Sequence, residues 1–160
     1  MPDIDSVNIS LPSLLDEVFA KFSPKASKEN IGELLVELDA LLSSRVVQAA
    51  LQLLDYQNIV IYHNSSKTQQ IAEINEGYRH GTLKLVRLFP RINYCTCDNF
   101  QQQVVGNQTN PSTAPYTCEH VLALRLAILL ESDKLRYEEL PAHKLKTLFS
   151  RFLPDNVIDD

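Results

Sequence analysis

The chain has 160 residues, of which 44% are apolar and 22% charged, and its net charge is −5. This length suits one domain with a sizeable core, and no stretch reaches the ~18 uncharged apolar residues that a membrane span requires. The acidic balance argues against a domain that grips nucleic-acid phosphates unaided, because such domains are usually basic.

The N-terminal region, residues 1–57, is expected to be helical. Apolar side chains recur at helical spacing over residues 11–22, where a Ser-Pro pair closes the segment. The same spacing predicts a second helix over 28–42. A serine pair then supplies a cap for a short third helix over about 45–54.

The pattern changes to short β-branched segments after these helices. Residues 59–62 and 70–74 are typical of two strands joined by a polar turn, and alternation over 83–89 predicts a third strand. We therefore predict a small antiparallel sheet, which together with the cysteine motif described next forms the region 58–131.

All three cysteines of the chain fall within one pattern, Cys95-Thr96-Cys97 followed by Cys118-Glu119-His120. Three thiolates and an imidazole are a complete tetrahedral ligand set for a structural zinc ion. In an extended segment residues i and i+2 share a face, so Cys95 and Cys97 can meet the same ion. Cys118 and His120 converge only if a helix begins between them, and the N-terminus of that helix also favours thiolates. We therefore predict one Zn²⁺ bound by these four side chains.

Other chemistry fits the same cysteines less well. A nucleophilic cysteine needs a base and a polarising group, and a redox pair is usually spaced C-x-x-C. The acidic, polar start of the chain is unlike a secretory signal, so we expect an intracellular protein, in which an odd cysteine count argues for metal rather than disulfides. Four protein ligands leave no open position for water, so the metal is expected to be structural and the protein not an enzyme.

No other motif points to catalysis. The sequence contains no glycine-rich phosphate loop, no G-x-S-x-G and no H-E-x-x-H. The remaining histidines, His63, His80 and His143, stand in polar or turn-like stretches and are expected at the surface.

The spacer between the two halves of the motif, residues 98–117, is rich in Gln, Asn, Thr and Pro. Loops of this length without regular structure are usually functional or disordered. We expect a flexible spacer, with disorder around residues 106–114.

The C-terminal part is expected to be mostly helical. A helix over 119–130 carries His120 and an apolar stripe of Leu122, Leu126 and Leu129. The tail, residues 132–160, is expected to contain a turn near 135–140 and a last short helix over 143–152. These regions are expected to form one compact unit of the α+β class.

Basic side chains recur around the third predicted strand, at Arg79, Lys84, Arg87 and Arg91. Two interpretations stay open. They can form a solvated strand face, or they are candidate contacts to nucleic acid, which would also need exposed aromatic side chains nearby.

The pattern C-x-C, a variable spacer and C-x-H resembles the SWIM zinc finger. Phe100 follows the first pair as in Cys-x-Cys-x-x-Phe, and Ala123 follows the histidine as in His-x-x-Ala. This extended form resembles the SWIM-type subunit of the Shu complex, an accessory of homologous recombination. Residues 43–55 are similar to the segment preceding the finger in that family, so the resemblance spans roughly residues 11–130.

Phe100 and Ala123 also have packing interpretations. Phe100 is expected to pack over the metal centre. Ala123 lies one helical turn beyond His120 and shares its face, so a small side chain there is expected to let the helix approach the Cys95–Cys97 segment.

The resemblance implies a function, partners and a cellular location. It implies a non-catalytic subunit that pairs with RecA-like recombinase paralogues, supports assembly of the recombinase filament on single-stranded DNA, and works in the nucleus. The alternative is a SWIM finger that binds DNA directly, as proposed for such domains in transposases and chromatin ATPases. The acidic balance and the absence of an ATP site are compatible with the first hypothesis, and only the basic residues near the third strand support the second.

Overall fold

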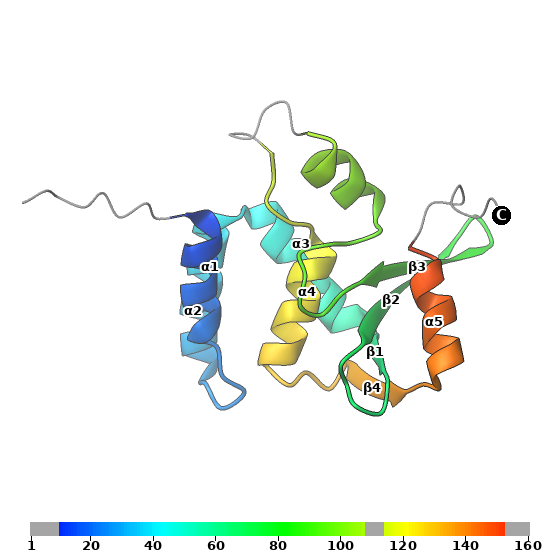
Figure 1. The fold of residues 1–160 in the computed structure, drawn as a ribbon. Helices are drawn as coiled ribbons and strands as arrows, with labels where there is room; N and C mark the ends of the chain where they lie inside the picture. The colour runs from blue at the N-terminus through cyan, green and yellow to red at the C-terminus, as the bar shows by residue number, and fades with distance from the viewer. Residues whose placement is uncertain (1–9, 108–113, 153–160) are drawn as a thin grey trace, which may run out of the picture.

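The computed structural model describes residues 10–107 and 114–152 and shows a mixed helix and sheet fold, which confirms the α+β prediction (Figure 1). The N-terminal helices are α1 (Leu11–Ala20), α2 (Lys28–Leu41) and α3 (Ser44–Tyr56). The strands are β1 (Ile59–His63), β2 (Gln70–Arg79), β3 (Thr82–Leu88) and β4 (Leu135–Glu139). The remaining helices are η1 (Phe100–Val105), α4 (Glu119–Leu129) and α5 (Ala142–Ser150).

Each of the three N-terminal helices begins after a serine that caps it. The hydroxyls of Ser10, Ser27 and Ser43 accept hydrogen bonds from the backbone N–H three residues later, at 3.2–3.4 Å. Such caps satisfy one of the backbone donors that a helix start leaves unpaired, which is why the predicted helix starts are nearly right.

The sheet has the strand order β3-β2-β1-β4. The pairs β1–β2 and β2–β3 are antiparallel, as predicted, but β4 pairs with β1 in parallel, where the sequence had predicted only a turn. The prediction of a purely antiparallel sheet was therefore wrong at this edge. The cause is that β4 is an edge strand whose side chains are mostly exposed, so its sequence carries no alternation of buried and exposed residues.

Helix α4 lies between the N-terminal helices and the sheet (Figure 1). Its Leu122, Ala123 and Leu126 pack with α1, α2 and α3, while its Leu124 and Ala127 pack with the sheet and the cysteines. The predicted single apolar stripe was therefore incomplete, because this helix is buried on two sides.

The spacer is not a continuous loop. Residues 100–105 form the short π-helix η1, where a flexible segment was expected. Most of the stretch expected to be disordered, residues 108–113, lies outside the described residues.

At the other end of the chain, α5 confirms the predicted last helix. Its Phe149 stacks on Phe89, with ring centroids 6.0 Å apart, so the tail packs beside the segment that leaves β3. Among residues 10–107 and 114–152, no helix is long and apolar enough to cross a membrane.

Candidate metal centre

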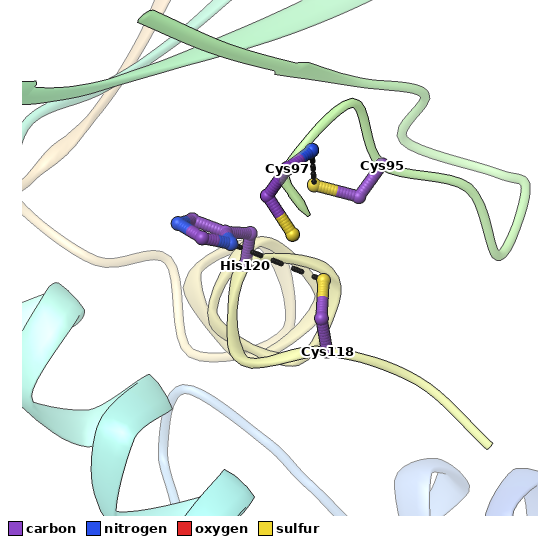
Figure 2. Close-up of side chains that lie close together, drawn as sticks. All are labelled: Cys95, Cys97, Cys118 and His120. Atoms are coloured by element: carbon purple, nitrogen blue, oxygen red, sulfur yellow. Dashed lines mark hydrogen bonds between the residues drawn. The ribbon is translucent and has the colours of Figure 1, made fainter. Parts of the chain in front are cut away.

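Four buried side chains from two distant segments meet at one point. Cys95 and Cys97 follow β3, and Cys118 and His120 stand at the start of α4 (Figure 2). One ligand atom from each residue lies within 4.8 Å of the others, and all four residues are buried. The structure therefore brings together the four predicted ligands, in an arrangement that could hold a metal ion.

The Cys95–Cys97 segment is held against the edge of β3. Cys95 forms an isolated antiparallel bridge with Leu88. Thr96 donates its backbone N–H to the Arg87 carbonyl at 3.0 Å, and its hydroxyl accepts the Arg87 N–H at 2.9 Å. These two bonds anchor Thr96 to β3 and so place the cysteines on either side of it beside the sheet.

Backbone amides point at two of the three sulfur atoms. The Cys97 N–H donates to Cys95 Sγ at 3.4 Å, and the Phe100 N–H donates to Cys97 Sγ at 3.3 Å. The Phe100 side chain is itself 2% exposed and packs in the same cluster as the three cysteines. Such N–H donors offset the negative charge of a thiolate, so the local backbone favours the form that binds metal.

Cys118 and His120 converge because the chain enters a helix between them. Cys118 is the N-cap of α4 with extended dihedrals (φ −106°, ψ 169°), and its side chain caps no backbone N–H. His120 is already helical, and its Nδ1 lies 3.9 Å from Cys118 Sγ. The change from extended to helical backbone between Cys118 and His120 thus points both side chains toward the same site.

Proton binding in the cluster follows from its charges. Burial disfavours the imidazolium of His120, but hydrogen bonds and charge interactions with Cys118, Cys97 and Glu76 outweigh burial and raise its pKa to about 10. Hydrogen bonds with Cys118 and Cys95 hold the pKa of Cys97 far below its ordinary value. Hydrogen bonds with Cys118 and Cys97, together with burial, raise the pKa of Cys95. These directions favour a thiolate at Cys97 and a proton on His120, and metal binding requires the ligating nitrogen to lose its proton.

Asn93 joins the two halves of the site, and sequence reasoning missed it. Its amide nitrogen donates to the Tyr116 carbonyl at 2.8 Å, and its amide oxygen accepts from the Thr117 hydroxyl at 2.7 Å. The segment that precedes Cys95 is thus tied directly to the segment that precedes Cys118. A lone Asn in a polar stretch carries no sequence signal for such a role.

Two further side chains brace the cysteine segment. Asn99 Nδ2 donates to Glu119 Oε2 at 3.1 Å, which links the start of the spacer to the first turn of α4. Gln101 Nε2 donates to the Cys95 carbonyl at 2.6 Å. Both hydrogen bonds require a defined conformation of residues 98–102. Because the sequence predicted a flexible spacer there, neither bond was expected.

Glu76 was also missed, although it contacts a predicted ligand. Its Oε1 lies 2.8 Å from His120 Nε2, and its Oε2 lies 2.6 Å from Lys84 Nζ. Burial acts to raise the Glu76 pKa, but Lys84 and His120 outweigh burial and leave it below the ordinary value. Oε1 is therefore hydrogen-bonded to His120, while Oε2 is held in an ion pair with Lys84.

The basic residues near β3 are not a free cationic stripe. Arg87 Nε lies 2.7 Å from Glu73 Oε2, and Lys84 is paired with Glu76. Arg91 is exposed in the segment after β3, and Arg79 is the last residue of β2. The two paired side chains are thus neutralised within the fold, which weakens their interpretation as phosphate contacts.

The structure places two other residues, Ala123 and His63, differently from what the sequence predicted. Ala123 is fully buried but packs in the helical cluster with α1–α3, rather than against the Cys95–Cys97 segment. His63 was expected at the surface but is 7% exposed, because it ends β1 on the same side as the buried Ile59 and Ile61. His80 and His143 are exposed, as predicted.

Comparison of the chain with protein-family models, curated proteins and solved structures finds no match.

Proposed function

We propose that this chain is a non-catalytic, zinc-binding interaction subunit of the SWIM type, which supports homologous recombination repair in the nucleus together with RecA-like recombinase paralogues. The observation that carries the zinc assignment is the buried cluster of Cys95, Cys97, Cys118 and His120. The recombination role rests on the resemblance of the sequence motif to the Shu-complex subunit.

Zinc suits this cluster in ligand type and in size. Three sulfurs and one nitrogen form a set that zinc binds tetrahedrally, with Zn–S of about 2.3 Å and Zn–N of about 2.0–2.1 Å. A regular tetrahedron with these bonds has ligand–ligand distances of about 3.6–3.8 Å. The Cys118 Sγ to His120 Nδ1 distance of 3.9 Å is close to that value, and the longest separation, within 4.8 Å, closes by about 1 Å through side-chain rotation.

The proposed zinc is structural rather than catalytic. Four protein ligands fill the tetrahedron and leave no position for water or substrate. All four ligand residues are also buried, so a substrate would have no access to the ion. The metal's contribution is then to folding, because metal binding to such a site is linked to folding of the segments that carry the ligands.

A role in protein interaction fits the charge and the surface. The net charge is −5, and two of the four basic candidates are paired with carboxylates. Two tyrosines are largely exposed, Tyr56 at the end of α3 and Tyr78 near the end of β2, at 79% and 76%. Exposed tyrosines are enriched at protein interfaces, where they bury apolar area and still hydrogen-bond.

The proposal is tested by metal analysis and co-purification. Purified protein should contain one zinc per chain, and Cys118→Ser and His120→Ala should lose both the zinc and a RecA-like partner. Protein that contains no zinc after purification without chelators would refute the metal assignment. Ligand variants that lose zinc yet bind the partner and support repair fully would refute its functional role.

Direct DNA binding is the competing outcome of the same experiments. Purified protein that binds single-stranded DNA with an affinity that falls steeply with salt would favour direct phosphate contact. Loss of DNA association with retained partner binding in the ligand variants would point the same way.

A further inference from the structure

The carboxylate of Glu76 lies on the far side of the His120 ring from the cysteines. Its Oε1 is 2.8 Å from His120 Nε2, while the other ring nitrogen, Nδ1, lies 3.9 Å from both Cys118 Sγ and Glu119 Oε1. The His120 side chain is 2% exposed, so water does not compete for either nitrogen. Nε2 is thus within hydrogen-bonding distance of a carboxylate, whereas Nδ1 lies on the side of the cysteines.

This arrangement selects one form of the imidazole. The second oxygen of Glu76 is 2.6 Å from the Lys84 ammonium, so the carboxylate acts as an acceptor and the hydrogen between Glu76 and His120 lies on Nε2. In a neutral ring the lone pair is then on Nδ1, the nitrogen that faces the thiols. A carboxylate in this position also makes the ligating nitrogen more basic and fixes the ring orientation.

The β2–β3 hairpin explains how Glu76 reaches the ring from 44 residues away. Glu76 follows the buried Ile74 by two positions on β2, so it points to the same side of the sheet, which α4 covers. The strand register then shifts between Asn75 and Tyr78, with Gly77 at φ +83°, a conformation that favours glycine. Lys84 stands on the opposite strand and holds the second carboxylate oxygen at 2.6 Å.

We infer that Glu76 is a positioning residue for the metal centre, which fixes His120 as an Nδ1 ligand and joins the metal to the irregular end of the β2–β3 hairpin. The inference rests on the proposed metal site and adds a residue that the ligand motif does not contain. A carboxylate behind a metal-bound histidine typically contributes about 10–100-fold to metal affinity.

The test compares Glu76 with a matched neighbour on the same strand. Glu76→Ala removes the carboxylate, and Glu76→Gln keeps its size but removes its charge. Glu73→Gln is the control, because Glu73 is also on β2 and also pairs with a β3 cation, Arg87, at 2.7 Å, yet it points away from His120. Each full chain is loaded with Zn²⁺ in competition with a chelator of known affinity, and the ring nitrogens of His120 are observed by ¹⁵N NMR.

Glu76→Ala should weaken zinc binding by about 10–100-fold, and Glu76→Gln by about 10-fold, while Glu73→Gln leaves the affinity unchanged. The zinc-loaded wild type should show a metal-bound Nδ1 and a protonated Nε2. If Glu76→Ala does not fold, the Glu76→Gln affinity and the wild-type NMR spectrum carry the test alone. Wild-type protein that binds no zinc overturns the metal site itself. Wild-type protein that binds zinc through Nε2, or Glu76 variants that bind it as tightly as wild type, overturn only the role of Glu76.

Discussion

Cys118→Ser separates the contribution of the metal from that of the helix start. Cys118 is the N-cap of α4 but its side chain caps no backbone N–H. Serine is among the best N-cap residues and stabilises a helix by about 0.5–2 kcal/mol relative to alanine. Burying the hydroxyl in place of the thiol costs about 1–3 kcal/mol. The metal-free proteins measure the net of these two effects, so the additional loss seen with zinc reports the missing metal ligand.

The expected loss follows from ligand linkage. Free zinc at about 1,000 times its dissociation constant stabilises the folded protein by about 4 kcal/mol. For a domain of this size, each 1 kcal/mol shifts Tm by about 2–4 °C, so zinc-loaded wild type should melt about 8–16 °C above Cys118→Ser. With a chelator present, the two proteins should melt within a few degrees of each other.

The loss should also be local. The three cysteines lie in the sheet-side cluster, whereas the cluster that α1, α2 and α3 form with one side of α4 contains none of them. Hydrogen exchange should therefore accelerate in residues 93–107 and 116–121 of Cys118→Ser and stay slow in the buried parts of α1–α3. A Cys118→Ser protein that keeps one zinc per chain and melts with zinc-loaded wild type would refute this reasoning.

Three further predictions concern pH, packing and the partner surface. Zinc binding at pH 7 should release protons. The metal-free His120 has a pKa of about 10, so its ring is protonated at pH 7 and must lose the proton on the ligating nitrogen when zinc binds. Stability from zinc is thus present at neutral pH and lost as pH falls, and calorimetry in buffers of different ionisation enthalpy measures the protons released. Ala123→Leu should cost about 1–3 kcal/mol by overpacking the contact of α4 with the N-terminal helices, and leave the zinc content unchanged. Tyr78→Ala should weaken partner binding by about tenfold without changing zinc affinity, as measured by titration with the partner.

Each of these has an outcome that contradicts it. Zinc retained down to strongly acidic pH would contradict thiolate ligation, and an Ala123→Leu protein that loses its zinc would place Ala123 against the metal segment after all. Unchanged partner affinity in Tyr78→Ala would remove the β2 end from the interface, with Val36→Ala on α2 as a control for another exposed apolar side chain.

The ligand set and most of the elements were predictable from local patterns. Helical spacing and capping serines define α1–α3, since both depend on residues within one or two turns. The four metal-site residues were found for a related reason: their residue types and i, i+2 spacing carry the chemistry before any tertiary contact forms. The SWIM-type role of these four residues stays a prediction.

Other features depend on contacts between segments far apart in the chain. Glu76 reaches His120 across 44 residues through the fold of the β2–β3 hairpin, and Lys84 and Arg87 are paired with carboxylates on the neighbouring strand. The parallel pairing of β4 arises from backbone hydrogen bonds, which any side-chain sequence can make at an exposed edge. Local periodicity holds no information on such partners, because the energy that selects them comes from groups that meet only after the chain has folded.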